Sequence, residues 1–196
     1  MVDIGEKLKN CVVGVAGLGG VGSGVGQRLV RGGIGKVVIA DCDVVEAANL
    51  YRQSYFTDQV GKSKVQACIE NLKRIRNDVE ITSYKVKVTP ENIIKIFEKV
   101  KVAAECFDAA EQKQMFVENL LSRDDNIKIV AASGIAGFGK SNDIQTRRLN
   151  SRLSVVGDFK SGVDREQVLT AGRVGIAACH QANAVIEILL NQDLEM

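Results

Sequence analysis

The glycine-rich stretch Ala16–Gly33, AGLGGVGSGVGQRLVRGG, contains the residues of this chain best suited to bind an anion. Its G-x-G-x-x-G pattern directly follows the apolar run CVVGVA and consists of Gly17, Gly19 and Gly22. Between a strand and a helix, such glycines let backbone N–H groups approach a phosphate at the positive end of the helix. Gly20 keeps a further Cβ atom away, and Ser23 offers a hydroxyl donor in the first helical turn. We therefore expect a phosphate-bearing ligand at this loop.

A carboxylate follows the glycine loop at the sequence distance that is typical of a ribose-binding acid. Asp41 ends the second apolar, β-rich run, roughly 20 residues after the glycine loop. In nucleotide-binding α/β units, an acid at this place accepts hydrogen bonds from ribose hydroxyls. NAD(P) and ATP both carry that ribose. Up to Asp41, an NAD(P)-dependent oxidoreductase and an ATP-using enzyme therefore fit equally well.

The elements that must position these residues alternate along the chain. The predicted strands are Val12–Ala16, Lys36–Asp41, Glu80–Val86, Val102–Phe107 and Ile127–Ala132. Helical periodicity predicts helices within residues 60–75, over Pro90–Val100 with Thr89 as N-cap, and over Gln112–Leu121. Strands that are apolar almost throughout and are separated by helices indicate an α/β fold, with a Rossmann-like, mostly parallel sheet covered by helices on both faces.

The last third of the chain has a different character. The segment DIQTRRLNSRLSVVGD alternates well enough for one or two further strands, and residues 158–172 are polar without a period, which predicts a mobile loop. The tail VGIAACHQANAVIEILL predicts a helix that is buried in the core or against another subunit. With 196 residues, we expect a single domain over residues 1–196.

Composition excludes several classes of partner and site. A net charge of +2 gives no support for a nucleic-acid or membrane partner, and we find no apolar run of membrane-spanning length and no secretion signal, so a cytoplasmic location is expected. The five cysteines form no C-x-x-C pair, so we expect no zinc and mostly buried, reduced thiols. Cys179 is interpreted as a core thiol rather than a nucleophile, and His180 as a packed or capping residue.

Four successive motifs separate the two nucleotide hypotheses. GLGGVGS, DCDVVEAANLYRQ, VGKSKVQA and CFDAAEQK resemble the signatures of the ThiF/MoeB/HesA family, the adenylating enzymes related to ubiquitin-activating enzymes. Downstream, AASGIAGFGKSNDI and GRVGIAACHQAN are most similar to the short ThiF branch, family two, the sulfur carrier protein ThiS adenylyltransferases. The resemblance covers most of the chain and favours ATP as the ligand.

The resemblance implies a role for each matching position. The four glycines of the loop would line the ATP phosphates and Asp41 would bind the ribose. Side chains that would face the phosphates are Asn49, Arg52, Gln53 and Lys64. Lys62 does not align with the phosphate-contacting lysine of the family. Asp108 would hold Mg²⁺, so ATP and Mg²⁺ are the expected substrate and cofactor. Arg52, Lys64 and Asp108 would carry the catalysis.

These residue types suit the chemistry of adenylation, in which a carboxylate takes AMP from ATP and pyrophosphate leaves. Cations and Mg²⁺ stabilise the charge that develops on the leaving phosphates. A protein C-terminus, with a pKa of about 3.3–3.7, is already ionised, so no general base is needed. Other interpretations stay open from the residues alone: Arg52 and Lys64 as solvated surface charges, Asp108 as a helix cap, and Asp43 as a turn residue.

We expect an adenylyltransferase that activates the C-terminal glycine of a small ubiquitin-like, ThiS-like sulfur carrier ending in Gly-Gly, for thiamine thiazole synthesis. A homodimer is expected from the apolar C-terminal helix, and residues 159–172 are a candidate clamp for the carrier's tail. That loop has no cysteine for a sulfur relay, and the N-terminal segment offers only Lys7 or Lys9 where some relatives insert a partner's arginine. The alternatives are an NAD(P)-dependent oxidoreductase and a non-catalytic nucleotide-binding scaffold.

Overall fold

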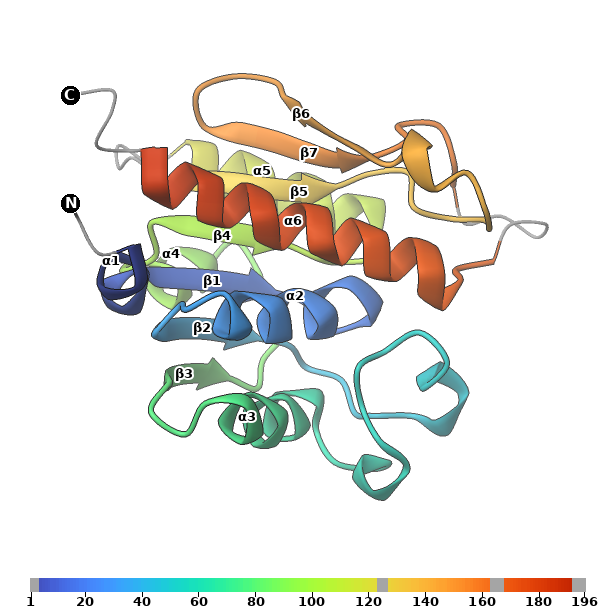
Figure 1. Cartoon of the computed structure of the whole chain (residues 1–196), viewed down its shortest axis with the longest axis horizontal. Helices are drawn as coiled ribbons and strands as arrows, with labels where there is room; N and C mark the ends of the chain where they lie inside the picture. Colours follow the sequence, from blue (N-terminus) through green and yellow to red (C-terminus); the bar gives the residue numbers. More distant parts are fainter. Residues whose placement is uncertain (1–3, 123–126, 163–167, 192–196) are drawn as a thin grey trace.

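A seven-stranded sheet forms the centre of the molecule (Figure 1). The computed structural model describes residues 4–122, 127–162 and 168–191. The strand order is β3-β2-β1-β4-β5-β7-β6, with all neighbours parallel except β6 and β7. The strands are β1 (Val12–Ala16), β2 (Lys36–Ala40), β3 (Glu80–Tyr84), β4 (Val102–Glu105), β5 (Lys128–Ala132), β6 (Gln145–Arg148) and β7 (Leu153–Gly157).

Helices cover both faces of this sheet, as the sequence pattern predicts (Figure 1). They are α1 (Ile4–Asn10), α2 (Gly20–Arg31), α3 (Lys64–Ile75), α4 (Ile93–Ile96), α5 (Ala110–Leu121) and α6 (Ala171–Asn191), together with the short 3₁₀ helices η1 (Ala47–Asn49), η2 (Thr57–Gln59) and η3 (Ser141–Asp143). Because successive strand residues point to opposite faces, the strands contribute to two separate apolar clusters. Val13 and Val15 pack with α2 and α6, whereas Ala103 packs on the other face with Phe97 and Phe116.

The prediction for the helix that begins at Pro90 was wrong in extent. The α-helical part is limited to Ile93–Ile96, and turns flank it on both sides. Thr89 is not its N-cap: the Thr89 N–H donates to Asn92 Oδ1 at 2.8 Å, and Asn92 occupies the N-cap position. Three isoleucines in this segment lower its helix propensity, because β-branched side chains lose rotamer freedom in a helix.

The long helix α6 corrects the prediction for Cys179 and bears on the expectation that no segment could span a membrane. By length and composition alone it is long and apolar enough to cross a membrane, contrary to our expectation from the sequence. Nine of its residues are nevertheless buried in the structure, and polar Gln181 is among them, donating to the Glu105 and Val130 carbonyls at 2.9 Å. Since its buried stripe packs on the sheet and α2, α6 is a core helix. Cys179 lies on its exposed side and is not a core thiol.

Other sequence predictions agree with the structure. The segment 143–158 forms the antiparallel pair β6 and β7, and the predicted helix over Gln112–Leu121 is α5. All five cysteines lie in the described residues and form no disulfide bond, and three of them are buried. His180 is half-buried, and its Nδ1 lies 3.0 Å from the Thr146 hydroxyl, which ties α6 to β6.

Candidate active site

The predicted site residues meet at the carboxyl edge of the sheet, where the strand arrows end in Figure 1. The sheet runs outward in both directions from the pair β1 and β4, with β2 beyond β1 and β5 beyond β4. Such a reversal of strand order separates the loops that follow the two central strands and leaves room for a ligand there. The glycine loop follows β1, Asp41 follows β2 and Asp108 follows β4.

The glycine loop makes a tight turn from β1 into α2. Gly17 has φ +85°, and its N–H donates to the Ala40 carbonyl at 2.9 Å. A Cβ atom at Gly22 would collide with the Gly17 carbonyl oxygen, so glycine is required for this close approach. Gly19 is the N-cap of α2 and makes no side-chain cap, so the first N–H groups of α2 are available to an anion.

The Ser23 hydroxyl is hydrogen-bonded within the chain itself. It donates to the Gly19 carbonyl at 2.6 Å and accepts from the Ser54 N–H at 3.0 Å. The side chain is buried. Ser23 therefore fastens the start of α2 to the segment that carries Arg52 and Gln53, and its contact with the ligand stays a prediction.

Asp41 is buried and fixes the turn after β2. Its Oδ2 accepts from the Leu18 N–H at 2.6 Å, and its Oδ1 accepts from the Asp43 N–H at 2.7 Å. The carboxylate thereby joins the glycine loop to the 41–43 turn. Each oxygen retains a lone pair, so the group can still accept hydrogen bonds from ribose hydroxyls.

The segment after η1 brings two polar side chains, those of Arg52 and Gln53, toward the start of α2, whereas the Asn49 amide donates to Glu46 Oε2 at 3.1 Å. Asn49 ends η1, and its carbonyl accepts from the N–H groups of Arg52 and Gln53 at 3.2 and 3.1 Å. A Cβ atom at Gly20 would lie 3.5 Å from the Arg52 carbonyl and 3.7 Å from its Cγ, so Arg52 lies beside the glycine loop. Its guanidinium stacks on the Tyr51 ring at 4.9 Å. Among the described residues, no carboxylate pairs with this guanidinium.

Gln53 has a buried amide oxygen beside the glycine loop. The residue is only 8% exposed, and its Oε1 has no hydrogen-bond partner among the described residues. Its Nε2 faces Gly19, at 4.0 Å from where a Cβ atom would lie. Buried polar atoms are nearly always paired, so this amide beside the loop is suited to bind a ligand.

Lys64 begins α3 and is almost completely buried. Ser63 caps the helix, accepting from the Gln66 N–H at 3.2 Å, and the Lys64 N–H donates to the Asp43 carbonyl at 2.9 Å. The Lys64 ammonium donates to Asp43 Oδ2 at 2.7 Å. It is therefore not the solvated surface charge that remained open from the sequence. Lys62, in contrast, pairs with Glu70 at 2.8 Å.

Asp108 is exposed just beyond β4. The N-cap of α5 is Ala109 and no side chain caps that helix, so Asp108 is not the helix cap that remained open from the sequence. Its carboxylate makes no hydrogen bond or ion pair within the described part of the chain. The turn that carries it is held by buried Glu105, whose carboxylate accepts from the Phe107 N–H at 2.7 Å and from Lys113 Nζ at 3.1 Å.

The donor set at this edge fits Mg²⁺ together with a nucleotide. Mg²⁺ in phosphate-binding sites is held by one or two carboxylates and by phosphate oxygens, and Asp108 is an available carboxylate next to the glycine loop. Within the described residues, one group of three possible ligand atoms lies close together, in Asp41, Cys42 and Asp43. Since Asp41 and Asp43 already accept from backbone N–H groups and Lys64, Asp108 is the better candidate.

The sequence left two parts of this site unassigned. Asp43 was interpreted as a turn residue, yet it holds Lys64. The Tyr55 hydroxyl donates to the Leu18 carbonyl at 2.8 Å and so fixes the glycine loop, while burial raises the pKa of Tyr55 well above its ordinary value. The second acid of DCD was a visible signal for Asp43, whereas nothing local in the sequence distinguishes Tyr55.

The predicted loop over residues 158–172 is anchored at its beginning. Asp158 accepts from the Lys160 and Ser161 N–H groups and from Arg173 at 2.6 Å. The last two residues of the prediction belong to α6, and residues 163–167 lie outside the described residues. The mobile loop and the carrier clamp therefore remain predictions.

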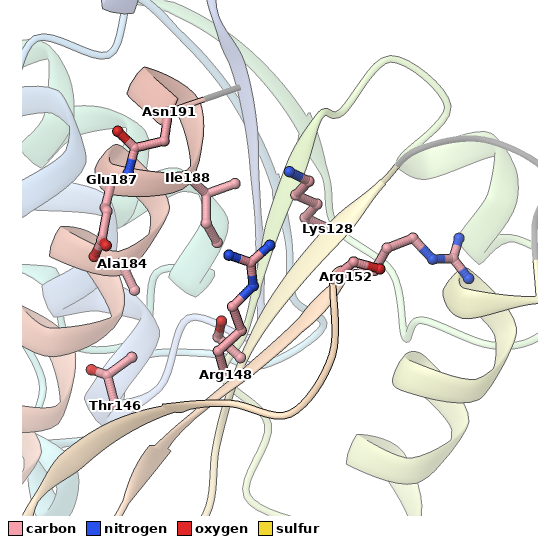
Figure 2. Close-up of a pocket in the computed structure, with 10 residues that line it drawn as sticks. Lys128, Thr146, Arg148, Arg152, Ala184, Glu187, Ile188 and Asn191 are labelled. Atoms are coloured by element: carbon pink, nitrogen blue, oxygen red, sulfur yellow. The ribbon is translucent and has the colours of Figure 1, made fainter. Parts of the chain in front are cut away.

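The opposite edge of the sheet contains a separate pocket and the N-terminal lysines. The pocket has a volume of about 230 Å³ and lies between α6 and the β6–β7 pair, with Lys128, Arg148, Glu187 and Ile188 in its lining (Figure 2).

In α1, Lys7 donates to the Leu190 carbonyl at 2.9 Å and Lys9 is exposed. Neither lysine can reach the glycine loop of its own chain, because α1 precedes β1 at this far edge (Figure 1).

Comparison of the sequence with known proteins identifies the family of this chain. The sequence profile of the ThiF family matches residues 2–195. Ubiquitin-like modifier-activating enzyme 5 of Arabidopsis thaliana is 30% identical over 179 residues, which cover 91% of this chain and 39% of that protein. The sulfur carrier protein ThiS adenylyltransferase of Bacillus subtilis is 38% identical over 126 residues, 63% of this chain and 36% of that protein. The chain thus spans well under half the length of these curated relatives.

Solved structures share the fold. The E. coli tRNA N6-threonylcarbamoyladenosine dehydratase TcdA, in complex with ATP, superposes with a TM-score of 0.89 over 98% of this chain and 91% of that one, at 18% identity. E. coli MccB with ATP gives a TM-score of 0.70 at 24% identity, over 95% of this chain and 57% of that one. At these identities the likeness concerns the fold alone.

Proposed function

The chain belongs to the ThiF family, and from this premise we propose that it is an ATP-dependent adenylyltransferase that activates the C-terminal carboxylate of a small ubiquitin-like protein. Two relatives support the class of substrate. One is named for activating ubiquitin-like modifiers and the other for adenylating the sulfur carrier ThiS. The finer proposal is a ThiS-like carrier ending in Gly-Gly, which would connect the chain with thiamine thiazole synthesis in the cytoplasm.

One observation carries the proposal: four segments far apart in the sequence bring three groups suited to phosphate and one suited to a metal ion to one edge of the sheet. The N–H groups at the start of α2, the Arg52 guanidinium, the Lys64 ammonium and the Asp108 carboxylate all surround the ends of β1, β2 and β4. Hydride transfer to or from a nicotinamide does not need two cations and a free carboxylate there. This donor set therefore favours ATP over NAD(P).

Each residue has a physical task in the reaction. The carrier's ionised carboxylate oxygen attacks the α-phosphorus of ATP, and the bond to the β-phosphate oxygen breaks, so an acyl-adenylate and pyrophosphate form. Negative charge grows on the departing pyrophosphate, and the α2 N–H groups, Arg52 and Lys64 stabilise it. Asp41 orients the nucleotide through its ribose. No proton has to be removed from the nucleophile.

Asp108 would hold Mg²⁺, which when bound neutralises phosphate charge and polarises the phosphorus centre. Asp108 itself makes no hydrogen bond within the described ranges, and its turn is fixed by Glu105 and Lys113. This hydrogen bonding would keep the turn in place for a carboxylate that binds the metal ion.

The test is exchange of radiolabelled pyrophosphate into ATP with candidate diglycine carriers. We expect exchange that requires both Mg²⁺ and the carrier's terminal glycine, and that is lost in Asp108→Asn, with Asp78→Asn on the opposite edge as the control. ATP binding without exchange for any carrier would indicate the non-catalytic scaffold. Calorimetric binding of NADH in place of ATP would indicate the oxidoreductase.

A further inference from the structure

The Lys64 ammonium is paired with a carboxylate of the chain itself. Its Nζ lies 2.7 Å from Asp43 Oδ2, and the two side chains differ greatly in accessibility, at 8% exposed for Lys64 and 60% for Asp43. The hydrogen bond from Lys64 is the largest of the influences that lower the pKa of Asp43, so this carboxylate is ionised at neutral pH. The cation proposed to bind phosphate thus already has an anionic partner.

Asp43 is held firmly as part of the site. Its N–H donates to Asp41 Oδ1 at 2.7 Å, and its carbonyl accepts from the Lys64 N–H at 2.9 Å. A backbone bridge between Val44 and Ser63 fastens the same turn to the start of α3. The carboxylate therefore faces Lys64 because the backbone places it there, next to the acid proposed to bind the ribose.

The difference in accessibility points to an exchange of partners. A buried ammonium without a partner carries a large desolvation cost, so Lys64 always requires an anion. Asp43 does not share this requirement, because its exposed carboxylate is readily hydrated after Lys64 leaves it. The Glu105–Lys113 pair has the reverse arrangement, with the carboxylate fully buried and the lysine 26% exposed, as in a structural pair.

We propose that Asp43 is the resident counter-ion of Lys64, which keeps the ammonium in the site while it is empty and is displaced from it by a nucleotide phosphate. Asp43 is then a positioning residue that acts through Lys64, and it lowers the affinity for nucleotide because phosphate must compete with it. This inference rests on the proposed function, since it takes ATP as the ligand.

The test is titration calorimetry of a non-hydrolysable ATP analogue with Mg²⁺, and of adenosine, on Asp43→Asn. We expect the analogue to bind about three- to tenfold more tightly than to the wild type, as follows from removing one partner of a partly exposed pair. Adenosine, which has no phosphate, should bind as before. Asp43→Glu, which restores the charge, should return the analogue's affinity toward the wild-type value.

A double-mutant cycle separates this mechanism from general charge repulsion. In a Lys64→Met background, Asp43→Asn should give no gain in affinity, because no ammonium remains to compete for. Asp78→Asn, which removes the same charge from a half-exposed pair with Arg76 on the far edge, should leave the affinity unchanged.

Three results would overturn the inference: unchanged or weaker analogue binding to Asp43→Asn, an equal gain in the Lys64→Met background, or an equal gain in Asp78→Asn. If Asp43→Asn fails to fold, the Asp43→Glu variant decides, since analogue binding below a tenth of the wild-type affinity would contradict a counter-ion role. A wild-type chain that binds no ATP analogue at all would reject the proposed function as well.

Discussion

At the scale of single residues, two ion pairs of this site differ in which partner is buried, the acid or the base. The buried acid of Glu105–Lys113 holds a backbone turn, whereas the exposed acid of Asp43–Lys64 faces a buried cation. Arg52 differs from both, because its guanidinium stacks on the Tyr51 ring and pairs with no carboxylate of the described residues. The Glu105–Lys113 pair is thus structural, Lys64 is a cation that can exchange its partner, and Arg52 is a cation without an acidic partner among the described residues.

Replacing Arg52 by alanine should slow pyrophosphate exchange, because one preorganised donor for the leaving phosphates is lost. We expect the transition state to lose about 2–4 kcal/mol of stabilisation. Exchange kinetics with a cognate carrier measure this effect. Arg31→Ala at the other end of α2, exposed to solvent, is the matched control. Equal rates for the two variants would contradict the role of Arg52.

The Glu105→Gln variant should change how stability depends on pH. Burial raises the pKa of Glu105 above its ordinary value of 4.5. A raised carboxyl pKa means that the folded state holds the proton more tightly, so this contribution to stability is complete below pH 4.5 and is lost as the pH rises through the folded-state pKa. Glutamine stays neutral, so the variant lacks this decline.

Urea denaturation of wild type and Glu105→Gln at several values between pH 4 and 8 measures this difference. The free energy of unfolding of the wild type should fall relative to that of the variant as the pH rises. The same series on Glu111→Gln, an exposed acid in the first turn of α5, should show no such trend. A wild-type advantage that grows with pH would show that the ion pair with Lys113 outweighs desolvation.

At the scale of elements, the sequence predicts strands and long helices well because their apolar periodicity is strong. All five predicted strands exist, and three of them end one to two residues early, at Ala40, Tyr84 and Glu105. Residues just beyond a strand, such as Asp41 and Cys106, stay apolar or buried because they line the edge, so composition does not show where pairing stops. The short α4 depends on tertiary contacts of Ile93 and Phe97, which local propensity does not contain.

The candidate site was predictable only in part, because it too depends on tertiary contacts that the local sequence does not contain. The motifs single out Asp41, Arg52, Lys64 and Asp108, which lie at one edge of the sheet in the structure, and their roles there remain predictions. The Ser23 hydroxyl bonds to Ser54, a residue 31 positions away, and Asp43 bonds to Lys64 across 21 positions. Such partners depend on how separate loops meet in space, and one sequence does not contain that information.

Two glycines of α2 should respond in opposite ways to alanine. In Gly22→Ala, the new Cβ would collide with the Gly17 carbonyl, so we expect destabilisation by about 1–3 kcal/mol and weaker ATP binding. In Gly26→Ala, the nearest atom would be Leu72 Cδ2 at 3.7 Å, an ordinary contact. Here alanine should stabilise by up to about 1 kcal/mol, because glycine is a poor helix former.

Thermal unfolding and calorimetric ATP titration of the two variants test this contrast. Gly22→Ala should unfold at a lower temperature than the wild type and Gly26→Ala at an equal or higher one. Nucleotide affinity should change only in the first. The interpretation of the glycine loop would fail if Gly22→Ala were neutral in both measurements.

At the scale of the whole molecule, the association of two copies is still a prediction. The expected apolar surplus of α6 is smaller than its composition suggests, because Ile176, Ile186 and Ile188 pack against the chain's own core. Its outward stripe contains Cys179, Asn183 and Glu187. In a dimer, the exposed Lys9 of α1 would be available to the nucleotide site proposed for the partner copy, which it does not reach in its own chain.

Multi-angle light scattering at several protein concentrations should give a mass of twice 21.2 kDa. Lys9→Ala should then slow pyrophosphate exchange, since a cation from the partner's α1 would be lost from each site, while Lys36→Ala serves as the control. A concentration-independent monomer of 21.2 kDa would reject the dimer, and it would assign all catalytic cations to one chain.

Both outer strands of the sheet are poor templates for another strand. Strand β6, QTRR, is exposed along its whole length and ends in two arginines, and β3 at the other margin is polar and carries Glu80 at its start. Unpaired strand edges are the usual starting points of aggregation, and charges placed there oppose it by repulsion and by the cost of removing water. The protein should therefore remain dispersed when it is concentrated or refolded, and copies that do associate should use helical surfaces instead of continuing the sheet.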